Sequence, residues 1–197
     1  MNRISFLKKH PLTITWISTS WNLLYGIFLI FLFVTQSSWW YLALAGFFLT
    51  LGAGRFLAVS GRGRDCTVMR ILAVMMTFLA VVIAGITHLT ITGEINPVKN
   101  KILTIAQAAF VFGLIISAVI NTILSHRKNQ ARMIMIRNLS LASALGAMLS
   151  LERTMLGTFG HQGAHFNMQM EAGTGMLVFI LLLFLAYNLY RASQRIR

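Results

Sequence analysis

Six apolar blocks, each about the length of a membrane span, are the feature that most constrains this 197-residue chain. An α-helix rises about 1.5 Å per residue, so roughly twenty residues cross a hydrocarbon core about 30 Å thick. Because lipid offers no hydrogen-bond partners, the backbone N–H and C=O groups of each block must bond to one another, as they do in an α-helix. We therefore predict one all-α domain, a polytopic bundle of transmembrane helices at 14–35, 39–60, 68–91, 102–125, 138–158 and 172–190.

Basic residues are concentrated on one side of this predicted bundle. The chain holds 17 Lys and Arg against 4 Asp and Glu, and the basic residues lie between apolar blocks. A nucleic-acid-binding protein would gather them on one folded face, so we expect no nucleic-acid partner. Segments 55–70 and 127–137 and both termini hold nearly all of them, and the opposite side has only Lys99 and Lys101. Since basic loops stay inside, we predict a cell-membrane protein with both termini cytoplasmic and with basic loops against anionic lipid headgroups.

The order of turns and helices recurs along the chain. A short outer turn, a helix that returns inward and a basic loop follow one another three times, and Arg55, Asn121 and Asn188 take similar positions near the inner ends of three helices. This recurrence suggests three repeated helical hairpins. Hydropathy alone produces much of the same pattern.

The fifth predicted helix carries small residues and one charge on a single stripe. Its members are spaced three or four residues apart and are Ala142, Gly146, Ser150, Arg153 and Gly157. Small side chains let helices approach closely in lipid, so we expect this stripe to pack at the centre of the bundle.

Arg153 lies several residues below the outer boundary, where an uncompensated charge costs a few kcal/mol. Glu152 is its neighbour in sequence but lies about 100° round the helix, so the partner of each must come from another element. The candidates for Arg153 are Glu171 and Glu94. Two interpretations stay open: a structural ion pair near the outer headgroups, or an outward-facing cavity in which Arg153 binds an anionic group.

Three histidines lie on the predicted outer side: His88, His161 and His165. With Glu94 and Glu171 they offer nitrogen and oxygen ligands that suit zinc or a similar ion. Gly160 and Gly163 disfavour the helix that would place His161 and His165 on one face, so solvated loop histidines are the competing interpretation.

Polar residues inside the other helices predict hydrogen bonds between helices. Asn22, Tyr25, Gln107 and Asn121 are of this kind, and each such bond contributes about 0.6 kcal/mol. Arg55 lies about one turn from the predicted cytoplasmic boundary, so we expect its side chain to snorkel to the headgroups.

No nucleotide-binding glycine loop, catalytic triad or paired-cysteine motif occurs in the sequence. We therefore favour a non-enzymatic transport or ligand-capture protein with an outward-facing polar site formed by Arg153, Glu152 and Glu171. The alternative is an accessory or regulatory subunit that docks a cytoplasmic partner through basic residues such as Arg127, Lys128 and Arg132. A protein partner or a homo-oligomer is compatible with both functions. A metal-dependent membrane enzyme using the outer histidines is a third possibility.

A set of residues in five of the predicted helices and the turns beside them forms a pattern: Asn22, Tyr25, Ser38-Trp39, Arg55-Phe56, Asn121, Leu151-Glu152-Arg153-Thr154-Met155, Phe159 and Gly175. This pattern resembles a family of uncharacterised six-helix integral membrane proteins from Gram-positive bacteria. The resemblance covers most of the chain and implies the topology, with no activity to transfer. The chain is also similar in size and helix number to the substrate-capturing subunits of energy-coupling-factor vitamin transporters, but segment 15–36 lacks the Ala-x-x-x-Ala docking face of their first helix.

Overall fold

The computed structural model describes residues 11–60, 65–91, 101–126, 131–159 and 164–195. These residues form six α-helices and no strand within the described ranges: α2 (Pro11–Gln36), α3 (Trp39–Ser60), α4 (Asp65–Ile91), α5 (Lys101–His126), α6 (Ala131–Phe159) and α7 (Ala164–Arg195). Five are long and apolar enough to cross a membrane, and α2 adds the apolar stretch Thr19–Thr35. The predicted all-α membrane bundle is confirmed.

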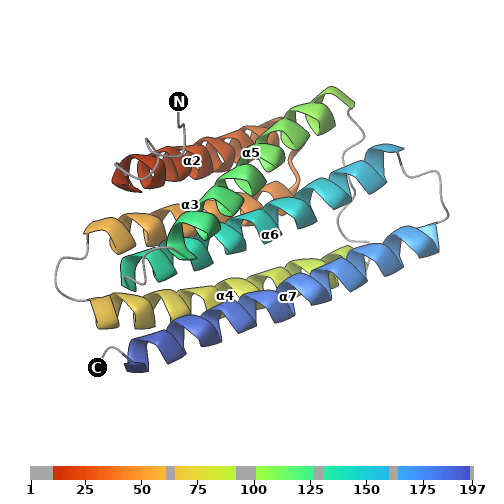
Figure 1. The fold of residues 1–197 in the computed structure, drawn as a ribbon. Coiled ribbons are helices and arrows are strands. Elements are labelled where there is room, and N and C mark those ends of the chain that lie inside the picture. The colour runs from red at the N-terminus through yellow and green to blue at the C-terminus, as the bar shows by residue number, and fades with distance from the viewer. Residues whose placement is uncertain (1–10, 61–64, 92–100, 127–130, 160–163, 196–197) are drawn as a thin grey trace.

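Successive helices run in opposite directions along one common axis (Figure 1). At one end of the bundle α3, α5 and α7 finish while α4 and α6 begin, and we call it the basic end because Arg132, Arg137, Arg191 and Arg195 lie there. At the opposite end α2 turns directly into α3. Ser37 makes that turn in the left-handed backbone region, with φ 50°, and its amide donates to the carbonyl of Phe33 at 2.7 Å. This bond closes the last turn of α2.

The predicted bounds agree best where apolar blocks end abruptly. Helix α3 begins and ends as predicted, whereas α6 begins seven residues before the predicted 138, and α7 extends past both ends of 172–190. The extra turns contain charged and amide side chains. They continue the helix beyond the apolar stretch, which hydropathy alone does not detect.

Helix α6 is the centre of the bundle. It contacts every other helix, most extensively α5, and then α7 and α3. The other two large contact surfaces join α4 to α7 and α2 to α3. The packing therefore differs from three consecutive hairpins, because α4 pairs with α7 and, within the described residues, makes no substantial contact with α5.

The outer surface of the bundle is apolar, as a lipid-facing surface must be. Large side chains such as Val34, Val74, Phe112 and Met176 are more than half exposed. The polar residues are turned the other way, because Asn22, Arg55, Gln107 and Ser140 are all buried. This arrangement, with apolar side chains outside and polar side chains inside, is the reverse of that in water-soluble proteins and agrees with lipid as the surrounding solvent.

Close contact between α6 and α3 depends on Gly146. A Cβ built on Gly146 would overlap the ring of Phe47, which is itself 1% exposed and cannot move aside easily. The small-residue stripe is thus buried as expected: Ala142, Gly146 and Ser150 all lie within the bundle.

We expect Gly146→Ala to destabilise the detergent-solubilised protein by about 1–3 kcal/mol, because a methyl group added to a filled interface forces its neighbours apart. The matched control is Gly85→Ala, since nothing lies within 4 Å of a Cβ built there. That control should be neutral or slightly stabilising, because alanine favours helix over glycine by about 1 kcal/mol. Thermal unfolding of both variants measures the difference, and equal midpoints would contradict the close-packing argument.

Candidate functional site

A stripe of hydroxyl side chains runs along α6 inside the bundle. Ser140, Ser143, Ser150 and Thr154 are all buried. At about 100° per residue they fall within roughly 80° of one another around the helix axis. Small hydroxyl groups on such a face allow neighbouring helices to approach and offer them hydrogen-bond partners. We call the buried polar contacts along this stripe the α6 polar seam.

The part of the α6 polar seam nearer the basic end is organised around Arg55 of α3. One guanidinium nitrogen, Nη2, donates to the hydroxyl oxygens of Ser140 and Ser143, at 3.2 Å in both cases. Asn121 of α5 donates to Ser140 at 2.8 Å, and Asn22 of α2 donates to Ser143 at 2.9 Å. Two serines of α6 therefore tie together side chains from three other helices.

The prediction that Arg55 snorkels to the headgroups is wrong. The side chain is 1% exposed and turns toward α6 instead of toward the end of the bundle. The physical reason is that α6 presents two serines close to α3, so the guanidinium finds hydrogen-bond acceptors inside. The sequence contains the signal, a row of serines in the fifth predicted helix, but it does not say which helix lies next to α3.

Toward the other end, the α6 polar seam continues through Ser150 and Thr154. Ser150 accepts from the hydroxyl of Tyr25 at 3.3 Å and from the amide of Gln107 at 2.5 Å. Thr154 donates to the amide oxygen of Gln107 at 2.9 Å. Gln107 thus uses both ends of its amide on α6, and a buried amide needs such partners.

Arg153 lies one position before Thr154 and is 4% exposed. Its guanidinium carbon is 3.9 Å from the ring centroid of Trp40, a cation–π arrangement. Glu171 of α7 and Tyr41 of α3 interact with Arg153 electrostatically. Charge on Arg153 is therefore stabilised by an aromatic face and a carboxylate from two other helices.

Glu152 takes its partner from α7, where Thr174 donates to Oε1 at 2.8 Å. Glu152, Arg153 and Glu171 line a small cavity together with Trp40 and Thr87. The cavity measures about 10 Å³, room for one water molecule. The predicted site residues of α6 and α7 thus come together, but around a space that is far smaller than a ligand-sized cavity.

The other predicted site residues are not brought to this cluster by the described structure. His88 is exposed in the last turn of α4. Glu94, His161 and the side chain of His165 lie outside the described residues. Among the side chains that are described, no group of three His, Cys, Asp or Glu is arranged to hold a metal ion.

The structure describes only one of the three residues predicted to dock a cytoplasmic partner. Arg127 and Lys128 lie outside the described residues. Arg132 is described, and its Nε lies 3.7 Å from Oδ1 of Asp65, with both side chains about one-third exposed. This ion pair links the start of α6 to the start of α4, so Arg132 has an internal structural contact.

Comparison of the sequence with protein-family models and with curated proteins finds no match. The resemblance to a six-helix family stays a prediction that rests on the residues named for it.

We expect Ser140→Ala to lower the free energy of unfolding by about 1–3 kcal/mol, since it removes the acceptor shared by Arg55 and Asn121 inside the bundle. Thr77→Ala is the control, because the hydroxyl of Thr77 bonds only the carbonyl of Ala73 in its own helix, so far as the described contacts show. That variant should change stability by a few tenths of a kcal/mol. Thermal unfolding in one detergent compares them, and equal effects would mean that the α6 hydroxyls do not hold the helices together.

Proposed function

We propose that this chain is a non-enzymatic membrane transport or ligand-capture protein for a small anion, and that the α6 polar seam forms the ligand path. The observation that carries the proposal is the burial of the Arg55 guanidinium among serine hydroxyls and asparagine amides inside the bundle. An ionisable side chain within the membrane is expensive to keep, and such residues mark ligand or ion paths by default.

The chemistry of the seam suits an anion. Guanidinium groups bind carboxylate or phosphate oxygens through two parallel hydrogen bonds. Serine hydroxyls and asparagine amides add neutral donors that lengthen such a site without adding charge. Arg153 carries a second guanidinium. At a helical rise of about 1.5 Å per residue, Arg153 lies about 15 Å further along α6 than Ser143. An anion that leaves one cationic side chain would thus meet another.

The small size of the cavity at Arg153 fits one state of an alternating cycle. Trp40 and Glu171 cover Arg153 on the sides of α3 and α7. Movement of α6 and α3 relative to α7 would open this end without unfolding any helix, as one part of a transporter bundle rocks against another. In this proposal the ring of Trp40 and the carboxylate of Glu171 interact with the guanidinium of Arg153 until an anion takes their place.

The experiment is flux of radiolabelled phosphate, sulfate and acetate into liposomes that contain the purified protein. We expect flux of at least one probe above that of empty liposomes. Arg55→Lys keeps the charge but loses the planar fork. It should reduce that flux at least about tenfold, the effect of losing about 1.4 kcal/mol of binding in the path. Thr77→Ala should leave flux unchanged.

Two controls separate a lost path from a lost fold. Size-exclusion profiles and thermal unfolding must show that Arg55→Lys retains the bundle. For the same three probes, a rise in the unfolding midpoint that depends on ligand concentration reports binding without transport. Two outcomes would contradict the proposal. One is that none of the three probes shows flux above that of empty liposomes or raises the unfolding midpoint. The other is full activity in a folded Arg55→Lys variant.

We further propose that the basic end faces the cytoplasm and that the protein lies in the cell membrane. The concentration of arginines at that end supports this orientation. Helix α7 offers a matched pair of exposed positions, Gln169 near its start and Gln194 near its end. Each is replaced by cysteine in a Cys66→Ala background, which removes the single native thiol.

A membrane-impermeant maleimide should label Gln169→Cys but not Gln194→Cys on intact cells, because only one end of α7 reaches the outside. Inverted membrane vesicles should give the reverse pattern. Labelling of both positions after detergent treatment shows that each cysteine is reactive. The reverse result on intact cells would place the basic end outside and exclude the proposed orientation.

A further inference from the structure

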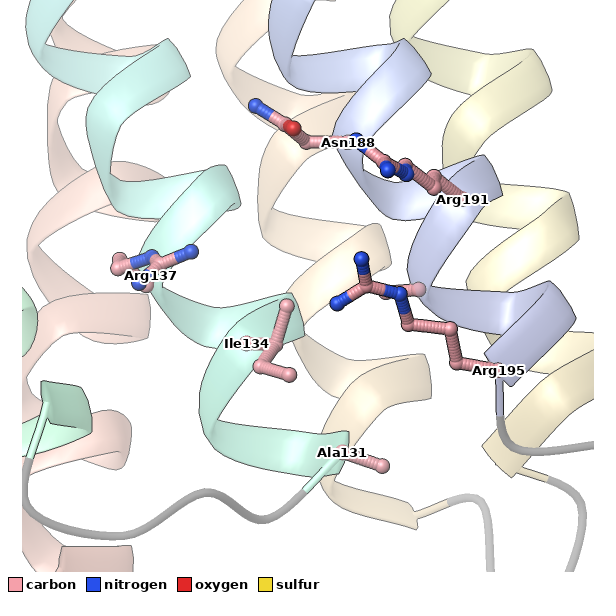
Figure 2. A pocket seen from close by; sticks show the side chains of 7 residues that line it. Ala131, Ile134, Arg137, Asn188, Arg191 and Arg195 are labelled. Carbon is pink, nitrogen blue, oxygen red and sulfur yellow. The ribbon is translucent and has the colours of Figure 1, made fainter.

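A cavity lies between α6 and α7 at the basic end, far from the cluster around Arg153. Its volume is about 460 Å³, and its lining includes Arg137, Arg191, Arg195 and Asn188. Figure 2 shows Arg195 extending from α7 toward Ile134 of α6, with Arg191 and Asn188 further along α7 and Arg137 on the other side of α6 in this view.

All the charged side chains that line this cavity are positive. No acidic residue that the structure describes lines the cavity: Asp65 lies at the same end but pairs with Arg132, and Glu152 and Glu171 lie near the opposite end. Within the described parts of the chain, no ion pair involves the three lining arginines. Three guanidinium groups around one open cavity make a local positive potential that favours an anion with several oxygens.

The face of α7 that leads to the cavity is apolar and exposed. Phe184, Asn188, Arg191 and Arg195 fall within about 60° of one another around α7, at about 100° per residue. Phe184 is 59% exposed. Leu177 lies earlier in α7, further from the basic end and on nearly the same face, and is 55% exposed. One continuous strip of α7 therefore changes from apolar to basic where the helix approaches the end of the bundle.

Two tyrosines mark the depth of this change. Tyr187 and Tyr190 are both more than half exposed and lie just before Arg191. Tyrosine collects at the boundary between hydrocarbon and headgroups because its ring is apolar and its hydroxyl is polar. The arginines of the cavity therefore lie at the depth of lipid phosphates, and the apolar strip lies at the depth of acyl chains.

We propose that this cavity binds the phosphate group of an anionic phospholipid, with one acyl chain along the apolar strip that contains Phe184. Guanidinium groups contact the phosphate oxygens in pairs, and the amide of Asn188 supplies a neutral partner for the rest of the headgroup. A free phosphate ion would use the arginines but would leave the adjoining apolar strip without a role. This site is separate from the α6 polar seam, so neither proposal depends on the other.

Native mass spectrometry of the full-length protein in mixed micelles of phosphatidylcholine and phosphatidylglycerol tests this proposal. The native chain should bind phosphatidylglycerol in preference to phosphatidylcholine. Arg191→Gln and Arg195→Gln should each weaken phosphatidylglycerol binding about fivefold and leave phosphatidylcholine binding unchanged, as expected for one basic side chain at a membrane surface. Both side chains are exposed, so these substitutions remove no buried packing.

A charge-matched control separates a site from general attraction. Lys8→Gln combined with Lys9→Gln removes two charges, as the double Arg191→Gln, Arg195→Gln variant does, but at residues remote from the cavity in sequence. It should retain the native preference for phosphatidylglycerol. An equal loss in the control and in the double arginine variant would overturn the proposal, as would a native chain with no preference.

Excess inorganic phosphate distinguishes the two sources of the anion. If the acyl chain contributes, added phosphate should leave phosphatidylglycerol bound, because the free ion makes only the polar contacts. Displacement of the lipid by inorganic phosphate would overturn the assignment to a phospholipid and would make the cavity a site for a soluble anion.

Discussion

Hydrogen bonds between the hydroxyl groups of α6 and the polar side chains of neighbouring helices are the interaction on which the rest of the structure depends. Hydrocarbon supplies no driving force that brings one apolar helix to another, so packing and polar contacts must do so. Ser140, Ser143, Ser150 and Thr154 make these contacts with α2, α3 and α5. Their partners are Asn22, Asn121, Gln107, Tyr25 and Arg55, so hydrogen bonds along a single line join side chains from four helices.

The same line explains how a charge is kept inside the bundle. Arg55 is buried where two serines accept from it, and Arg153 is buried where Trp40 offers a ring face and Glu171 a carboxylate. These two environments differ in kind. The serine hydroxyls give Arg55 hydrogen bonds without a formal charge, whereas the surroundings of Arg153 include the carboxylate of Glu171. This difference is the physical basis for giving Arg55 the leading place in the proposed path.

The two ends of the bundle have opposite characters. Around Arg153 the space between the side chains is small, with room for one water molecule, and side chains of both charges meet there. At the basic end a cavity of about 460 Å³ lies between α6 and α7, and its charged lining is wholly positive. The two ends therefore differ in the size of their cavities and in the charges that line them.

The sequence by itself determined the helix class, the number of helices and the bounds of α3, because the lengths of apolar blocks and the needs of the backbone in lipid are local properties. It also identified the small-residue stripe of α6 and the cluster of Glu152, Arg153 and Glu171 as residues that should meet. Only the tertiary structure decided that α4 pairs with α7, that Arg55 turns inward to Ser140 and Ser143, and that three arginines surround one cavity. Each of these facts depends on which helix faces which, and since nearly every helix here is apolar on most sides, hydropathy does not specify its neighbours.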